Sequence, residues 1–434
     1  MLEALLSARE RLIVTYTGRE PRDNSTRPPS VVVSELLGAL DEGFVLEPAA
    51  GEAQEQSVRA FVTVVHPLQA HSPRYFGADL DPRLFSYCTA QLQVARALSV
   101  EPEQAEPWFR RLLDGPSAPP STLELGRLIR FFELPVRFLL QERLGLYFRD
   151  GGEAIRDREP LELDALERYR LGATLLERCL EGESSERTLL TLRAAGVLPP
   201  GNAGRYAALG VQGEVRLLAQ LAAGWRTGEP ASPRPFELAL GTVTLVGLLE
   251  GLWPEARVTL EYGRVRARQQ LRAWLAHLVL SATGEPTPSV LVGRAEQDRG
   301  RRHGAVFVFE PIPPGEAVDR LVGLASLFEL GMRGPLAFFP EASLAFCEQE
   351  RRLGGDPEGV SRALAKARDV FRGVHRRAAE CDDPYVQRSF GDQDPLAAEY
   401  RPLRDEGGVV LPSFVEVSRQ VFCPMLARMA AGVP

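Results

Sequence analysis

The order of hydrophobic patterns between residues 236 and 310 constrains the fold of this chain more than any other feature. Three short segments there are β-branched or alternate between apolar and polar residues, with turn residues such as Gly241 and Pro254 between them. An amphipathic helical pattern and two further strand-like segments follow. The predicted strands are residues 236–240, 242–249, 256–262, 289–293 and 305–310, and the predicted helix is residues 266–281. This β-β-β-α-β-β order predicts an α/β (α+β) fold in which helices flank a mixed sheet.

Helical patterns dominate on both sides of this predicted sheet. The predicted helices are residues 121–148, 160–180, 185–195, 211–224, 316–331, 343–353, 359–377 and 413–430. Proline-bearing stretches predict a linker at residues 101–120. The chain is therefore divided into residues 1–100, the linker, and a C-terminal domain at 121–434. That domain consists of a helical part (121–230), a sheet core (235–310) and C-terminal helices (315–434).

The first hundred residues have a weaker pattern. Residues 11–17 predict a short buried strand, and residues 18–29 predict a polar loop. Ser30 is a suitable N-cap for a helix at residues 31–40. An apolar run at residues 61–65 predicts a second strand, and residues 66–77 are expected to be irregular.

Composition excludes several classes of protein. The formal net charge is −7 at pH 7, whereas a protein that coats DNA by itself is usually basic. No apolar run reaches the roughly 18 residues of a membrane span. Five widely spaced cysteines without a C-x-x-C pair predict neither a metal cluster nor a disulfide framework, and they fit a cytoplasmic protein. His66 and His71 lack a partner cluster, so we expect structural roles for them rather than metal ligation.

The segment Ala4-Leu5-Leu6-Ser7-Ala8-Arg9-Glu10-Arg11-Leu12 resembles the last motor motif of superfamily 1 helicases. In that motif an arginine contacts the γ-phosphate of ATP and stabilises charge as the bond breaks. Ser7 stands at the arginine position here, and a hydroxyl cannot supply a fixed positive charge. No G-x-x-x-x-G-K-[ST] loop occurs in the chain. We therefore expect no ATP hydrolysis by this polypeptide.

Further blocks extend the resemblance along nearly the whole chain. They are Tyr16, Gly18-Arg19, Asp23-Asn24, Pro29-Ser30-Val31, Glu35-Leu36-Leu37, His66-Pro67-Leu68-Gln69, Tyr75-Phe76, Phe85-Ser86-Tyr87, Phe131-Phe132, Arg143-Leu144-Gly145, Glu159-Pro160 and Gly334-Pro335-Leu336. Together they resemble the C-terminal part of the RecC family, the gamma subunits of exonuclease V. The resemblance implies that residues 1–100 are the end of a helicase-like domain. Whether the chain is a natural truncation or a fragment of a longer frame stays open.

A second resemblance concerns PD-(D/E)xK nucleases, whose restriction-endonuclease-like core has the predicted strand order. These enzymes hold Mg²⁺ with two acids, and a lysine orients the attacking water. The corresponding positions here are Glu250, Glu261, Gly263, Gln270 and Trp274. Glycine replaces the lysine at position 263, and the only lysine, Lys366, lies on a distant predicted helix. We expect a degenerate, inactive site, in which both glutamates are solvated residues at strand ends.

Arginines provide the candidate DNA contacts. Arg264, Arg266, Arg268 and Arg272 cluster at the start of the predicted helix 266–281, with Gln270 and Trp274 among them. Such a basic helix could follow phosphates while Trp274 stacks on a base. The alternative is a solvated helix face with Trp274 in the core, and we favour it. The segment GRRHG at residues 300–304 is either a DNA-contacting tip or an ordinary polar turn between strands.

The family resemblance implies a non-catalytic scaffold and DNA-handling subunit of a RecBCD-like helicase–nuclease in double-strand break repair. It implies partners of the RecB and RecD types, contact with DNA ends and single strands, and no membrane. Mg²⁺ and ATP would be used by the partner subunits, with no cofactor and no metal in this chain. One alternative is a Mg²⁺-dependent nuclease that uses Glu250 and Glu261. Another is a non-functional gene remnant with exposed apolar surface.

Overall fold

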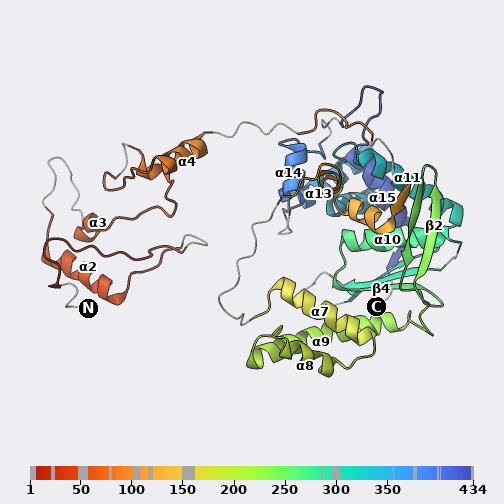
Figure 1. Cartoon of the computed structure of the whole chain (residues 1–434), viewed down its shortest axis with the longest axis horizontal. Coiled ribbons are helices and arrows are strands. Elements are labelled where there is room, and N and C mark those ends of the chain that lie inside the picture. The colour runs from red at the N-terminus through yellow and green to blue at the C-terminus, as the bar shows by residue number, and fades with distance from the viewer. Residues whose placement is uncertain are drawn as a thin grey trace. The chain divides into compact units, whose positions relative to one another are not determined.

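The computed structural model describes residues 6–20, 25–46, 57–77, 81–100, 108–115, 121–148, 162–284, 287–295, 304–354, 356–374, 379–397, 400 and 402–431 (Figure 1). The chain divides into two compact units, Met1–Glu103 and Gln104–Pro434. Each unit is described by itself below. Among the described residues, no helix combines the length and the apolar character needed to cross a membrane.

Short helices make up the regular structure of the first unit. They are α2 (Val31–Gly43), α3 (Val58–Val62), the 3-10 turn η1 (Pro73–Tyr75) and α4 (Thr89–Ser99). The predicted helix at 31–40 is confirmed and continues to Gly43, although the Ser30 side chain makes no capping hydrogen bond. Asp41 of α2 accepts hydrogen bonds from Ser57 Oγ (2.9 Å) and from the Arg59 backbone N–H (2.7 Å), which joins α2 to the start of α3.

Both strands predicted in the first unit are wrong. Residues 11–17 pair with no strand in the described part of the unit, and Phe61 and Val62 end helix α3. β-branched residues favour an extended backbone, but a strand needs a neighbour to accept its hydrogen bonds. Buried hydrophobic residues are also few among the described positions of this unit. They are Val58, Leu84 and Ala95.

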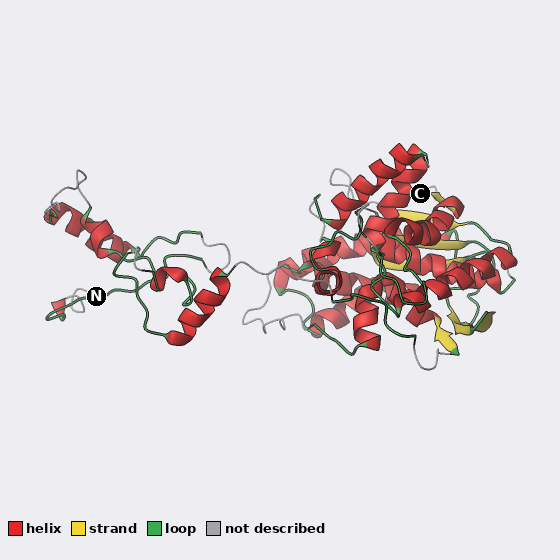
Figure 2. Ribbon diagram, turned by 90° about the horizontal axis from the view of Figure 1, so that it is seen from above, coloured by secondary structure: helices red, strands yellow, loops and turns green. Residues whose placement is uncertain are grey.

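The second unit contains two sheets among its helices (Figure 2). The first sheet has the order β1-β3-β2, with β1 (Thr122–Glu124) parallel and β2 (Arg234–Leu240) antiparallel to β3 (Val243–Leu249). Leu240 pairs with Val243, so two residues connect β2 and β3. The first of them, Gly241, has φ +69°, a left-handed conformation that glycine adopts without steric cost.

The second sheet has the order β4-β5-β6-β7. Strands β4 (Arg257–Arg264) and β5 (Ser289–Arg294) are parallel and are connected through helix α10 (Ala267–Ala282). Strands β6 (Gly304–Phe309) and β7 (Met429–Ala431) continue the sheet in antiparallel fashion. All five strands predicted in the core are therefore present, and the mixed α/β class is confirmed.

The expected single mixed sheet is nevertheless divided in two. Strand β3 uses both of its edges within the first sheet, one for β2 and the other for β1, so no edge remains to pair with β4. Strands β1 and β7 were not predicted, because each is three residues long and overlaps a segment that was predicted to be helical.

Helices account for most of the remaining chain in the second unit. They are α5 (Leu125–Glu133), α6 (Pro135–Phe138), the π-helical turn η2 (Leu139–Arg143), α7 (Ala165–Leu180), α8 (Ser185–Ala194), α9 (Gly201–Ala223), α11 (Pro314–Gly331), α12 (Pro340–Leu353), α13 (Pro357–Phe371), η3 (Glu380–Asp382), α14 (Pro384–Phe390) and α15 (Phe414–Arg428). Each predicted helix has a counterpart, whereas α14 was not predicted. Pro135 begins α6, which interrupts the helix expected at 121–148.

Strand β5 separates two hydrophobic cores. Leu291 belongs to the larger core on the α10 side, whereas Val290 and Val292 belong to a smaller core on the α7 and α9 side. This alternation follows from the two-residue period of a strand. Figure 1 shows α7 and α9 on one side of β4 and α10 on the other. Because β5 is buried on both faces, apolar residues follow one another without a polar interruption at positions 290–293.

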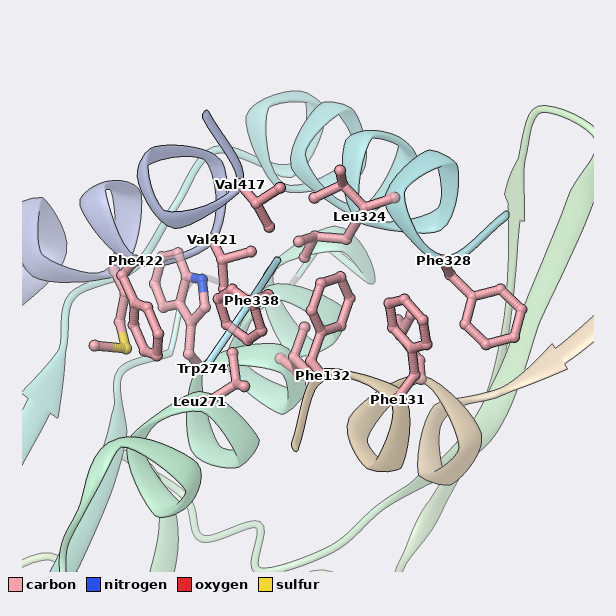
Figure 3. Packing of buried hydrophobic residues seen from close by; sticks show 14 of the residues in the cluster. Phe131, Phe132, Leu271, Trp274, Leu324, Phe328, Phe338, Val417, Val421 and Phe422 are labelled. Atoms are coloured by element: carbon pink, nitrogen blue, oxygen red, sulfur yellow. The ribbon is translucent and has the colours of Figure 1, made fainter. Parts of the chain in front are cut away.

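Aromatic residues fill the larger core (Figure 3). Phe131 of α5 contacts Phe132, Phe138 and Phe328 at ring-centroid distances of 5.0, 5.8 and 5.0 Å. These edge-on contacts are the favoured geometry for aromatic pairs. They connect α5 to α6 and α11 across nearly 200 residues of sequence.

Helix α10 lies at the centre of this packing and is more buried than the amphipathic pattern of its sequence predicts. Every residue from Ala273 to Ser281 is buried. Its polar member His277 places Nδ1 2.9 Å from Ser289 Oγ and Nε2 2.9 Å from the Glu310 carbonyl oxygen. A neutral ring that donates from Nε2 and accepts at Nδ1 satisfies both partners. Burial, with a smaller contribution from the positive charge of Arg257, lowers the pKa of His277 to about 4 from 6.5.

A buried polar network joins the smaller core. Glu214 of α9 accepts a hydrogen bond from Tyr262 Oη and pairs with Arg168 of α7 at 2.9 Å and with Arg294 of β5 at 3.5 Å. The Arg294 guanidinium also lies 5.0 Å from the ring centroid of Tyr262. Burial and the hydrogen bond to Glu214 raise the pKa of Tyr262 to about 12. The network fixes α7 and α9 against the sheet, because loss of one partner would leave a buried charge unpaired.

The stability of the second unit should depend on pH through His277. The folded state holds its ring neutral down to about pH 4, while the unfolded chain binds a proton below about pH 6.5, so this stability is lost as the pH falls through that window. The difference in unfolding free energy between the wild type and His277→Asn should therefore shrink by about 3 kcal/mol from pH 7 to pH 4. Urea titrations at several pH values measure this difference, and a constant difference would contradict the assignment.

Backbone protection should also differ between the two units. The described part of the first unit buries few apolar side chains, whereas the second unit contains both cores. Amides in α2 and α4 should therefore exchange with solvent at least about a hundredfold faster than those in α10 and β5. Hydrogen exchange followed by mass spectrometry makes the comparison. Equal protection in α2 and α10 would show that the first unit is more stable than its packing implies.

Candidate functional site

Glu250, the first nuclease-like acid, is exposed immediately after β3. Beside it, the Val258 N–H donates to the Gly251 carbonyl oxygen at 2.7 Å, which places Glu250 near the start of β4. Its charged neighbour there is Arg257. Burial lowers the pKa of Arg257 to about 10, and the negative charge of Glu250 opposes that shift.

Glu261, the second acid, lies further along β4, with its side chain 16% exposed. Burial raises the pKa of Glu261, while the positive charge of Arg272 lowers it in part. Arg257 and Glu261 are four residues apart on one strand, which corresponds to about 13 Å. The structure therefore places Glu250 near Arg257 and Glu261 near Arg272.

Arg272 of α10 is the cation next to Glu261. Its Nη2 lies 2.5 Å from Glu133 Oε1 and its Nη1 lies 3.4 Å from Glu261 Oε1. The guanidinium thus stands between a carboxylate of α5 and one of β4. The single positive charge of Arg272 therefore faces two carboxylates. Glu133 was not predicted as a site residue, because nothing in the sequence connects α5 with β4.

The remaining nuclease-like positions are Gly263, Gln270 and Trp274. Gly263 has Tyr169 Cε2 3.4 Å from the position of an added Cβ. Gln270 is buried, and its Oε1 has no hydrogen-bond partner among the described residues. Trp274 is 1% exposed and lies 5.9 Å from Phe309, centroid to centroid. Trp274 is therefore a core residue and cannot stack on a base while the chain is folded.

The four candidate arginines do not form one free basic surface. Arg272 is paired as described above, and the charge of Arg268 acts on Glu380, a buried carboxylate that accepts from the backbone N–H groups of Glu341 and Ala342. Burial raises the pKa of Glu380 to about 7. Arg266 is exposed at the start of α10, and Arg264 is half-buried at the end of β4. For these two, the described residues supply no carboxylate partner.

Other residues that the sequence singled out lie elsewhere. Ser7 is exposed in a turn of the first unit, and Lys366 is on α13. His66 Nδ1 lies 3.1 Å from Tyr75 Oη, and the two rings stack. Most of the segment at 300–304 is outside the described residues. Within the part of the chain that the structure describes, no three His, Cys, Asp or Glu side chains are grouped so that they could hold a metal ion.

Comparison with known proteins relates this arrangement to one family. The sequence model of the RecC C-terminal domain matches residues 120–351, which is more than half of the chain and includes both sheets except β7. The chain therefore belongs to the RecC C-terminal domain family.

Individual relatives agree with this assignment. The chain is 29% identical over 407 residues to the RecBCD enzyme subunit RecC of Escherichia coli K12, covering 92% of this chain and 34% of that protein. It is 28% identical over 401 residues to RecC of Mycobacterium tuberculosis CDC 1551 (91% and 34%) and 28% identical over 337 residues to RecC of Haemophilus influenzae Rd (75% and 27%). The chain thus spans about a third of the length of these relatives.

Removal of the Arg272 charge should change the pKa of Glu261. In Arg272→Met, the pKa of Glu261 should rise above its already raised value, because the cation that opposes the effect of burial is gone. A titration of carboxyl carbons by NMR, with labelled glutamate, measures the shift. Arg266→Met is the matched control, since Arg266 has no carboxylate partner in the described structure. An unchanged Glu261 titration in Arg272→Met would contradict the pairing.

Proposed function

We propose that this chain is a non-catalytic, RecC-like subunit that supports partner subunits and handles DNA within a RecBCD-type helicase–nuclease. Membership of the RecC C-terminal domain family supports the proposal. The observation that carries its non-catalytic part is the bridging position of Arg272 between Glu133 and Glu261. In this proposal the complex acts in recombinational repair of double-strand breaks, and the subunit contributes to duplex splitting, strand guidance and the response to Chi.

The strand order supports a further proposal about origin. Strands β2 to β6 with α10 follow the β-β-β-α-β-β order of restriction-endonuclease-like cores. In such a core the acids meet near one strand end, whereas here Glu250 and Glu261 lie beside different arginines. We propose that the domain retains this strand order without the nuclease site.

Partners and cofactors follow from the same proposal. RecB-type and RecD-type subunits would bind this chain, and the Mg²⁺ and ATP of the reaction would be used by those subunits. The chain itself would touch DNA through limited surfaces, such as the one that carries Arg264 and Arg266. Ser7 at the motor arginine position agrees with a subunit that does not hydrolyse ATP.

Co-expression with the RecB-type and RecD-type subunits of the same organism tests the scaffold role. The tagged full chain should purify with at least one of them in stoichiometric amounts. Failure of a folded, soluble chain to retain either subunit would contradict the proposed function.

A nuclease assay tests the non-catalytic role. The purified chain with Mg²⁺ should leave labelled duplex and single-stranded DNA intact, and Glu261→Ala should behave like the wild type, because that carboxylate already pairs with Arg272. Glu250→Ala is the companion variant for the other acid. Metal-dependent cleavage that disappears in Glu261→Ala would establish the alternative, a Mg²⁺-dependent nuclease.

A further inference from the structure

An apolar groove lies between helices α8 and α9 on the outer side of the smaller core. Its volume is about 360 Å³, which suits a few aliphatic side chains rather than a large cofactor. The floor and walls are formed by Leu189 and Leu190 of α8, Leu198 of the connecting turn, and Ala208 and Leu209 of α9. No part of the degenerate nuclease site contributes to this lining.

The groove leaves large apolar side chains in contact with water. Leu190 is 68% exposed and Leu209 is 57% exposed, and Tyr206 beside them on α9 is 81% exposed. The opposite face of α9 packs into the protein, because Val211, Val215 and Leu218 are buried in the smaller core. Single exposed leucines are common on protein surfaces, but neighbouring ones that line one groove are a feature of binding sites.

Positive charge surrounds the apolar floor. Arg193 and Arg205 line the groove, and neither pairs with a carboxylate among the described residues, while Glu186 is the acidic residue of the lining. Helix α9 begins at this groove with no acidic residue in its first turn and no side-chain cap from Pro200. Its N-terminal N–H groups therefore add to the positive potential.

The groove is held in shape by the turn before α9. A Cβ added at Gly204 would lie 2.0 Å from the Pro199 carbonyl oxygen, so the turn packs directly on the helix backbone. The N–H of Val197 donates to the Leu192 carbonyl oxygen at 3.1 Å and closes the end of α8. A site formed in advance reduces the ordering cost of binding.

We propose that this groove binds an amphipathic helix of a partner subunit, one that presents two or more aliphatic anchors together with carboxylates. The inference rests on the proposed function, and it names the surface through which part of the scaffold role is carried out. Two adjacent helices with an apolar seam are the arrangement that receives the apolar face of a third helix. Carboxylates on the incoming helix would complement Arg193 and Arg205.

Single-stranded DNA fits the groove less well. Proteins that bind single strands combine a basic track with aromatic side chains on which bases stack. The lining itself contains no aromatic residue, although Tyr206 lies beside it, and one of its two arginine charges is offset by Glu186. Aliphatic walls are suited to leucine-like anchors, and the arginines at the rim then confer specificity for an acidic helix.

Paired substitutions in the full chain test the proposal by co-purification with the RecB-type and RecD-type subunits. Leu190→Glu combined with Leu209→Glu should lower the amount of the bound subunit about tenfold or more, because it places carboxylates in the apolar floor. Leu248→Glu is the matched control, since Leu248 is also 57% exposed but lies on β3, away from the groove. Its retention of partner should equal that of the wild type.

A second variant keeps the test independent of folding defects. Arg193→Glu with Arg205→Glu changes only groove-lining side chains outside the hydrophobic cores, so thermal unfolding should match the wild type while retention of partner falls about tenfold. Unchanged retention in both double variants, with the wild type still bound, would overturn the groove proposal and leave the proposed function standing. Absence of binding by the wild type itself would instead contradict the proposed function.

Two further readouts exclude other occupants. Binding of a fluorescent 20-nucleotide single strand and the mass of the isolated chain by light scattering should be the same for the wild type and both double variants. Loss of oligonucleotide binding in the variants, with partner retention intact, would assign the groove to DNA. A wild-type dimer that the variants convert to a monomer would assign it to a second copy of this chain. Either result would overturn the proposal.

Discussion

Burial of helix α10 organises the second unit of this chain. The helix lies between strand β5 and the aromatic residues of α5 and α11, and even its histidine is enclosed and held by Ser289 Oγ and the Glu310 carbonyl oxygen. Strand β5 is then covered on its other face by α7 and α9. The packing on both sides excludes most of α10 and β5 from solvent. Functional surfaces must therefore lie at strand ends, at helix termini or on the outer helices.

The chemistry of the degenerate site follows from this packing. Helix α10 brings Arg272 to Glu261 and Glu133, so that a fixed cation belonging to the protein satisfies the two carboxylates. Glu250 lies near the other end of β4, beside Arg257. A bound metal ion would have to displace Arg272 from both Glu261 and Glu133. Glu261 thus serves in an ion pair with Arg272, whereas Glu250 is exposed and its charge acts on Arg257.

The sequence allowed the five central strands and the helix between them to be predicted, because their apolar periods are distinct. It could not reveal that the strands form two sheets, since this depends on β1, a three-residue strand that occupies the free edge of β3. The prediction of a strand at residues 11–17 is wrong for a related reason, because a strand forms only where a neighbouring strand accepts its hydrogen bonds. The acidic site positions Glu250 and Glu261 could be recognised from their residue types. The pairing of Glu261 with Arg272, and the role of Glu133, depend on contacts between elements far apart in sequence.

We propose that Glu250 and Glu261 do not form a metal site, because Arg272 already pairs with Glu261 while Glu250 lies near Arg257. Titration of Mn²⁺ into the metal-free chain, followed by electron paramagnetic resonance of the free ion, tests it most directly. We expect no stoichiometric binding of Mn²⁺ that depends on Glu250 or Glu261. One equivalent of bound Mn²⁺ that is lost in both Glu250→Ala and Glu261→Ala would contradict it.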